Sequence, residues 1–129
     1  MIALDTNVLV RVIVQDDPRQ TAAALALLKK DGPFFVGHLV LAETFWTLRR
    51  VYNFSTDEVR TVISDLLGRR DVVFENDDAV RAGLRAVERG GDFADALIVA
   101  KAREFDCTSL ATFDGNLAAR NSGFAFRPK

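Results

Sequence analysis

Histidine and cysteine are almost absent from this chain of 129 residues, which contains only His38 and Cys107. A lone cysteine excludes an internal disulfide and suits a reducing compartment such as the cytoplasm. One His and one Cys cannot assemble the nitrogen and sulfur ligand sets that zinc usually takes. A single histidine also excludes, within one chain, a ribonuclease that uses two histidines as acid and base. We expect His38 to be structural.

An excess of basic residues is missing too, since 17 Lys and Arg stand against 18 Asp and Glu, for a net charge of −1. The chain is therefore not expected to coat a polyanion by bulk charge, although a local patch can still hold one. The longest apolar run, Ala22 to Leu28, is far shorter than the ~20 residues of a membrane span. No basic leader precedes an apolar run at the start, so we expect no signal peptide. Together these absences predict a soluble, cytoplasmic protein with one domain over residues 1–129.

Short apolar runs alternate along the chain with longer helical patterns. Runs that are apolar on both faces are typical of strands in a parallel sheet covered by helices. They occupy residues 2–4, 34–36, 72–74, 109–111 and 124–126. Helices are predicted over residues 8–12, 21–30, 40–52, from the capping box of residues 55–58 to Gly68, over 79–89, and over 93–105, the last being largely buried. The alternation predicts an α/β fold, with a mainly parallel central sheet flanked by helices.

Acidic residues follow the ends of several predicted strands. Asp5 follows the first run, Asp114 follows the fourth, and Asp92 and Asp95 open the helix predicted over 93–105. Glu43 lies on the helix after the second run. Ligands bind at the carboxyl ends of parallel strands joined by right-handed crossovers, so we expect these acids on one side of the sheet. Each also has a structural interpretation, as a helix cap or a turn residue.

Glu43 is the exception, because apolar side chains surround it in the sequence and predict a buried carboxylate. A buried charge must be paired or bound to a metal. Two carboxylates ~4 Å apart repel by about 4 kcal/mol at an effective dielectric constant of 20. Several that converge without basic partners therefore need a divalent cation or raised pKa values. All-oxygen ligands favour a hard ion such as Mg²⁺ or Mn²⁺.

Four motifs, taken in order, resemble those of the PIN domain. They are Asp5-Thr6-Asn7-Val8-Leu9, Leu41-Ala42-Glu43, Asp92-Phe93-Ala94-Asp95-Ala96-Leu97-Ile98 and Thr112-Phe113-Asp114. More narrowly, nearly the whole chain is similar to the VapC toxins of bacterial and archaeal toxin–antitoxin pairs. The resemblance implies a PIN-like three-layer sandwich and a Mg²⁺- or Mn²⁺-dependent endoribonuclease that cleaves RNA with metal-activated water. It also implies inhibition by a VapB antitoxin, a homodimer, and a toxin–antitoxin heterotetramer or larger assembly that binds operator DNA only through the antitoxin.

The same resemblance assigns roles to individual residues. Asp5, Glu43 and Asp95 match the core catalytic and metal-binding acids, and Asp114 matches a fourth, more variable one. Asp92 is an additional carboxylate one turn before Asp95. The supporting polar residues are Thr6, Asn7 and Thr112. The family often has an aromatic residue three positions after the fourth acid, where this chain has Leu117.

Three further side chains are candidate contacts for RNA or the antitoxin. Arg50 lies seven residues after Glu43, on the same face of the predicted helix, and Arg11 lies close after Asp5. Trp46, three residues after Glu43, would stack on a base or an antitoxin side chain, although core packing is its favoured interpretation.

Two other classes of function stay open. An aspartate after the first strand also occurs in phosphotransfer proteins, but the phosphatases among them need a second aspartate where this chain has Asn7. Receiver domains need a lysine after a late strand, and none follows residues 109–111 before Lys129. The second alternative is a non-catalytic partner-binding module whose acids only cap helices.

Overall fold

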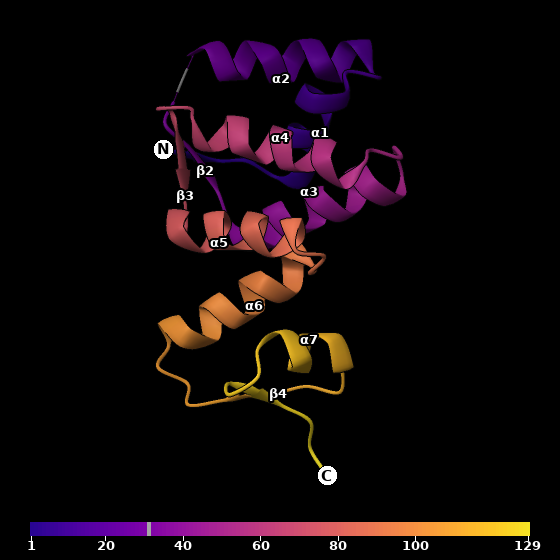
Figure 1. Cartoon of the computed structure of the whole chain (residues 1–129). Helices are drawn as coiled ribbons and strands as arrows, with labels where there is room; N and C mark the ends of the chain where they lie inside the picture. The colour runs from indigo at the N-terminus through magenta and orange to yellow at the C-terminus, as the bar shows by residue number, and fades with distance from the viewer. Residues whose placement is uncertain (31) are drawn as a thin grey trace. The chain divides into compact units, whose positions relative to one another are not determined.

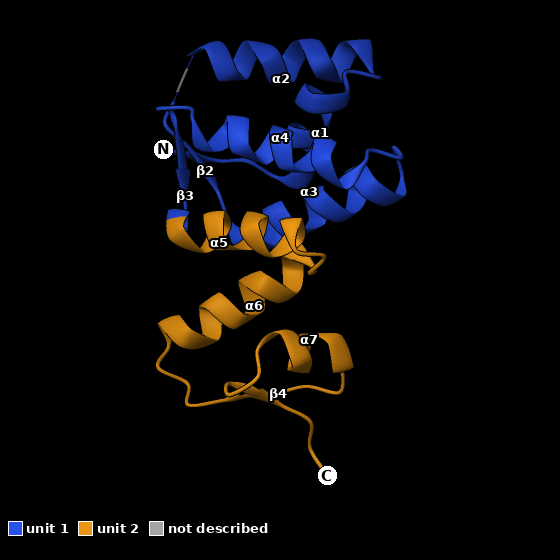
Figure 2. Cartoon of the chain, viewed as in Figure 1, with its two compact units in different colours: residues 1–77 blue, residues 78–129 orange. Residues whose placement is uncertain are grey.

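Strands and helices alternate along the computed structural model, which describes residues 1–30 and 32–129 (Figure 1). The chain divides into two compact units, residues 1–77 and residues 78–129 (Figure 2). The single domain expected over residues 1–129 stays a prediction. In the described ranges, no helix is both long enough and apolar enough to cross a membrane.

Over its described residues, 1–30 and 32–77, unit 1 contains a parallel sheet of three strands and four helices. Its elements are β1 (Ile2–Ala3), α1 (Thr6–Val14), α2 (Pro18–Lys30), β2 (Phe34–Val36), α3 (His38–Arg50), α4 (Thr56–Leu67) and β3 (Val72–Phe74). The strand order is β1-β2-β3, with Ile2 opposite Phe34 and Phe35 opposite Val73. Every neighbouring pair of strands is parallel because a helical crossover separates them in the chain.

The core of unit 1 forms where the central strand meets the buried faces of α3 and α4. Phe34 and Val36 of β2 have no exposed surface, because this strand has a neighbour on each side. Leu41 and Leu48, seven residues apart on α3, are equally buried, as are Val59 and Ile63 on α4. These spacings place each pair on one face of its helix.

Unit 2 contains helices α5 and α6, a short helix α7 and two parallel strands. The bounds are α5 (Asp77–Glu88, which starts at the last residue of unit 1), α6 (Phe93–Glu104), β4 (Leu110–Ala111), α7 (Gly115–Arg120) and β5 (Ala125–Phe126). Val99, Leu117, Phe124 and Ala125 form its hydrophobic cluster. A second contact joins α5 and α6, because the absence of a side chain at Gly83 admits the ring of Phe93.

The predicted α/β architecture with parallel strands and flanking helices is confirmed, and most helix starts lie where the caps predicted them. Ser55 and Glu58 form the capping box at the start of α4, and Gly68 ends that helix. The first helix is longer than predicted, and α7 was not predicted. The expectation that the helix of residues 93–105 is largely buried is wrong, since Ile98 is 51% exposed and Phe105 72% exposed.

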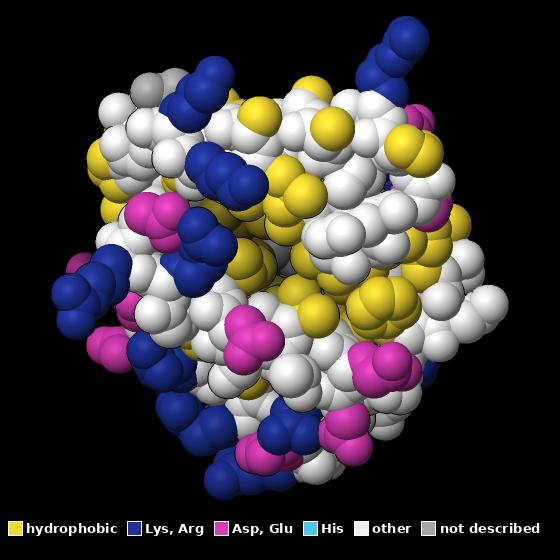
Figure 3. All heavy atoms as spheres, turned by 90° about the horizontal axis from the view of Figure 1, so that it is seen from above, with side chains coloured by type: hydrophobic (Ala, Val, Ile, Leu, Met, Phe, Trp, Pro, Cys, Tyr) yellow, Lys and Arg dark blue, Asp and Glu magenta, His cyan; other side chains and the backbone are white. Residues whose placement is uncertain are grey.

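One face of the molecule carries side chains of both charges (Figure 3). On the face seen in Figure 3, Lys and Arg side chains lie among Asp and Glu side chains and hydrophobic ones, so neither sign of charge dominates. Any binding of a polyanion must therefore use a local group of cations.

Candidate active site

Asp5 begins helix α1 directly after strand β1. Its backbone is extended, with φ −85° and ψ 162°, and its Oδ1 accepts a hydrogen bond from the Thr6 backbone N–H at 2.8 Å. The structural interpretation of Asp5 as a helix cap is therefore correct. The cap uses one carboxylate oxygen, so Oδ2 is left for another ligand.

Glu43 on α3 lies beside the start of α1, although 37 residues separate it from Thr6. The Thr6 hydroxyl donates a hydrogen bond to Glu43 Oε1 at 3.3 Å. The structure thus connects two of the predicted acids of unit 1, Asp5 and Glu43, through the side chain and backbone of Thr6. Thr6 therefore contacts both acids, and its supporting role in catalysis stays a prediction.

The prediction that Glu43 is a buried carboxylate is wrong, because its side chain is exposed. Helix α3 buries the face that carries Leu41, Thr44 and Leu48, and Glu43 lies outside it. Trp46 is 59% exposed, so the favoured interpretation of core packing is also wrong. Glu43 and Trp46 line one shallow hollow of about 320 Å³. An apolar sequence around an acid does not bury it when the acid falls on the outer face of the helix.

The two predicted arginine contacts of unit 1 differ in their surroundings. Arg50 ends α3 and is exposed. Arg11 is held by Gln20 at 2.6 Å, Asp16 at 3.1 Å and the Tyr52 hydroxyl at 3.2 Å. The hydrogen bond with Tyr52 raises the pKa of the Arg11 guanidinium above its ordinary value. Arg11 thus ties α1 to α2 and to the segment after α3.

Asn7, the remaining predicted residue of unit 1, is exposed on α1. It lines a separate hollow of about 480 Å³ between α1 and α2, with Arg11 and Gln20 among its neighbours there. No acid lines this hollow among the residues described.

In unit 2, two acids begin helices. Asp92 caps α6 by accepting a hydrogen bond from the Asp95 backbone N–H on Oδ2 at 2.9 Å. Asp114 caps α7 by accepting from the backbone N–H groups of Asn116 and Leu117 on Oδ1, at 2.9 and 3.0 Å. Thr112, predicted as a supporting residue, accepts from the Asp114 backbone N–H at 3.0 Å. As in Asp5, each carboxylate keeps one oxygen outside its cap.

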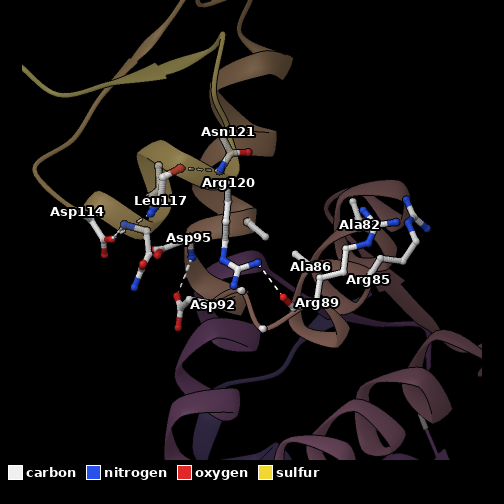
Figure 4. Close-up of a pocket in the computed structure, with 14 residues that line it drawn as sticks. Ala82, Arg85, Ala86, Arg89, Asp92, Asp95, Asp114, Leu117, Arg120 and Asn121 are labelled. Carbon is white, nitrogen blue, oxygen red and sulfur yellow. Dashed lines mark hydrogen bonds between the residues drawn. The ribbon is translucent and has the colours of Figure 1, made fainter.

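Asp95 completes the acidic group of unit 2. Burial raises the pKa of its carboxyl above the ordinary value, and the charges of Asp92 and Asp114 raise it further. Asp92 and Asp114 therefore lie close enough to Asp95 to repel its carboxylate. All three line one hollow of about 810 Å³, which α5, α6 and α7 enclose (Figure 4).

These acids fit a hard divalent cation by donor chemistry. Carboxylate oxygen is the ligand that Mg²⁺ and Mn²⁺ take, and a cation would relieve the repulsion around Asp95. Over residues 1–30 and 32–129, however, no group of three or more His, Cys, Asp or Glu side chains is arranged as a ready metal site. The fit thus rests on the type of ligand, not on a preformed coordination geometry.

The same hollow has a cationic side that the sequence reasoning missed. Arg85, Arg89 and Arg120 line it together with the three acids. Figure 4 shows Asp92, Asp95 and Asp114 on one side of the hollow and Arg85 and Arg89 on the other. None of these three arginines was among the candidate contacts predicted from the sequence. The signal in the sequence was the spacing of Arg85 and Arg89, four residues apart at the end of α5 and directly before Gly90-Gly91.

Comparison with known proteins identifies the family of the chain. No curated protein matches the chain at a significant level. A family model described as the PIN domain matches residues 2–121, which include the four acids predicted to be catalytic as well as Asp92. Because that match spans all but the first residue and the last eight, the chain belongs to the PIN domain family.

Proposed function

We propose that this protein is a divalent-metal-dependent endoribonuclease and the toxin of a toxin–antitoxin pair. PIN domains are generally nucleases, and generally use divalent metals. The observation that carries the proposal is the group of three carboxylates, Asp92, Asp95 and Asp114, that lines one hollow in unit 2. The contact between Thr6 and Glu43 in unit 1 supports it, because it ties a second pair of family acids together.

In this proposal, the acids that the family resemblance assigns serve the cleavage reaction. Asp5, Glu43, Asp95 and Asp114 would hold Mg²⁺ or Mn²⁺, with Asp92 as an additional ligand. When bound, such an ion supplies an activated water and neutralises charge on the phosphate. Thr6 and Thr112 keep the acids in place, Thr6 by donating to Glu43 and Thr112 by accepting from the Asp114 backbone.

The decisive test separates the charge of the acids from their capping role. Asparagine caps helices about as well as aspartate but carries no charge. Asp5→Asn and Asp95→Asn should therefore keep the melting temperature and lose RNA cleavage by at least about 100-fold in Mn²⁺. Asp65→Asn, at an exposed acid on α4, is the matched control and should cleave like the wild type. Calorimetric titration with Mn²⁺ should show binding that Asp95→Asn weakens and Asp65→Asn does not.

Full activity of Asp5→Asn and Asp95→Asn, in preparations free of contaminating nuclease, would contradict the proposal. It would favour a partner-binding module, in which Asp5, Asp92 and Asp114 act as helix caps alone. Labelling of Asp5 by acetyl phosphate would favour a phosphotransfer protein instead.

The toxin role is tested in cells. Induced expression in a bacterium should arrest growth, and Asp95→Asn should abolish the arrest. Co-expression of the protein encoded by the adjacent reading frame should relieve it, as a VapB-type antitoxin would. We also propose a cytoplasmic homodimer, which light scattering on the purified chain tests, and operator DNA binding only through the antitoxin. Growth arrest by Asp95→Asn equal to that of the wild type would contradict toxicity by cleavage.

A further inference from the structure

Three arginines converge on the acidic hollow of unit 2. Arg85 comes from helix α5, Arg89 directly follows the end of α5, and Arg120 comes from the end of α7. The hollow, at about 810 Å³, lies within the range of sites that bind small ligands. In Figure 4, Arg120 extends between the acids and the pair Arg85 and Arg89.

The backbone at the end of α5 fixes the position of Arg120. Its Nη1 donates a hydrogen bond to the Arg89 carbonyl oxygen at 2.8 Å. The adjacent Gly90 has φ +86°, and a Cβ there would lie 3.1 Å from Arg120 Nη2. Gly90 thus both turns the chain and leaves the space in which the guanidinium lies. Such a fixed cation loses little conformational freedom when it binds a ligand.

Among the described residues, the arginines of the hollow are not paired with its acids. In the part of the chain that the structure describes, none of the three arginines forms an ion pair, and the bond of Arg120 goes to a neutral carbonyl. Three positive and three negative side chains line the hollow, so their charges balance. A divalent cation on the acids would leave the hollow positive, and it would then attract an anion.

We infer that Arg120, with Arg85 and Arg89, forms a subsite for a backbone phosphate of the RNA substrate. The inference rests on the proposed function, because the anion it assigns is the RNA that the acids would cleave. A guanidinium donates two parallel hydrogen bonds to phosphate oxygens, which fixes orientation as well as position. The arginines are therefore substrate-binding residues next to the acids. Among them, Arg120 is the one that a hydrogen bond already holds in position before RNA binds.

Exposed arginines commonly contact only solvent. The test therefore needs a control arginine that is exposed on the same helix but does not line the hollow. Arg81 is on α5, exposed, and four residues before Arg85, and it does not line the hollow. Arg81→Ala is therefore the control for Arg85→Ala and Arg89→Ala. Arg89→Ala also keeps the carbonyl that holds Arg120.

Binding is measured by fluorescence anisotropy with a labelled pool of random 20-nucleotide single-stranded RNAs, in Ca²⁺ and over a series of NaCl concentrations. Arg120→Ala should bind about tenfold more weakly than the wild type. Arg85→Ala and Arg89→Ala should bind about threefold more weakly, and Arg81→Ala should match the wild type. Each lost phosphate contact should also lower the slope of log K against log salt by about 0.7. Arg120→Lys should bind RNA with an intermediate affinity, because lysine keeps the positive charge but lacks the two parallel N–H donors of the guanidinium.

Cleavage of the same pool in Mn²⁺ separates the two proposals. If the wild type cleaves RNA and all three hollow variants bind it as Arg81→Ala does, the phosphate subsite is wrong and the nuclease proposal stands. If the wild type neither binds nor cleaves RNA, both the proposed function and the phosphate subsite are wrong. If circular dichroism shows that Arg120→Ala is unfolded, the RNA affinities of Arg85→Ala and Arg89→Ala still test the phosphate subsite.

Discussion

Adding a single methyl group at Gly83 should destabilise the protein, although alanine is the better helix former. Gly83 is buried within α5, and a Cβ there would lie 2.9 Å from Phe93 Cε1 and 3.1 Å from Phe93 Cδ1. Phe93 is 1% exposed, so its ring has nowhere to move without displacing other buried atoms. Overpacking of this kind costs about 1–3 kcal/mol. The higher helix propensity of alanine relative to glycine offsets about 1 kcal/mol of this cost.

The net expectation for Gly83→Ala is a loss of about 1 kcal/mol in the free energy of unfolding, or roughly 3–5 °C in melting temperature. Differential scanning calorimetry measures it. Gly68→Ala is the matched control, because a Cβ at that helix end would meet the Asp65 carbonyl oxygen at an ordinary 3.4 Å. That variant should gain about 0.4–1 kcal/mol through the unfolded chain.

A double-mutant cycle tests the assigned cause. If the ring of Phe93 is the obstacle, Gly83→Ala combined with Phe93→Leu should lose at least about 0.5 kcal/mol less than the two single losses together. A Gly83→Ala protein as stable as the wild type, or losses that simply add, would refute the close contact between α5 and α6.

Three other predictions concern helix ends and the fixed arginine. Ser55→Ala should lower the free energy of unfolding by about 1 kcal/mol in urea titrations at neutral pH, whereas Ser64→Ala, an exposed serine inside α4, should change it little. Hydrogen bonds from the backbone and hydroxyl of Ser55 lower the pKa of the Glu58 carboxyl below its ordinary value. The stability that Glu58 contributes is therefore present above its unfolded pKa and lost as the pH falls through the folded value, so Glu58→Gln should flatten the acid limb of a plot of stability against pH. Gly90→Ala should weaken RNA binding as Arg120→Ala does, because the added Cβ displaces the guanidinium; equal binding by the wild type and Gly90→Ala would contradict that placement.

Local signals in the sequence predicted elements whose ends depend on a few neighbouring residues. The capping box of Ser55 and Glu58 is an example, since both partners lie within one turn of the helix that they begin. Helix α7 was missed for the opposite reason: Asp114-Gly115 has the composition of a turn, and only the side-chain bonds of Asp114 show that a helix follows.

Properties that depend on tertiary contacts were harder to predict. Trp46 was expected in the core because large aromatic side chains tend to be buried, but α3 buries the face that carries Leu41 and Leu48 instead. The acids were found from their places after strands and at helix starts. Arg120 was not found, because its role depends on a carbonyl oxygen 31 residues earlier in the chain.

Under the proposed function, the helix caps formed by Asp92 and Asp114 restrict how this chain can lose metal-dependent cleavage during evolution. A change to a hydrophobic residue at either position removes a cap as well as a charge, and so damages the fold at once. Descendants that have abandoned nuclease chemistry but still fold should therefore carry asparagine, serine or threonine there. Such residues mark an inactivated copy more specifically than the mere absence of an acid.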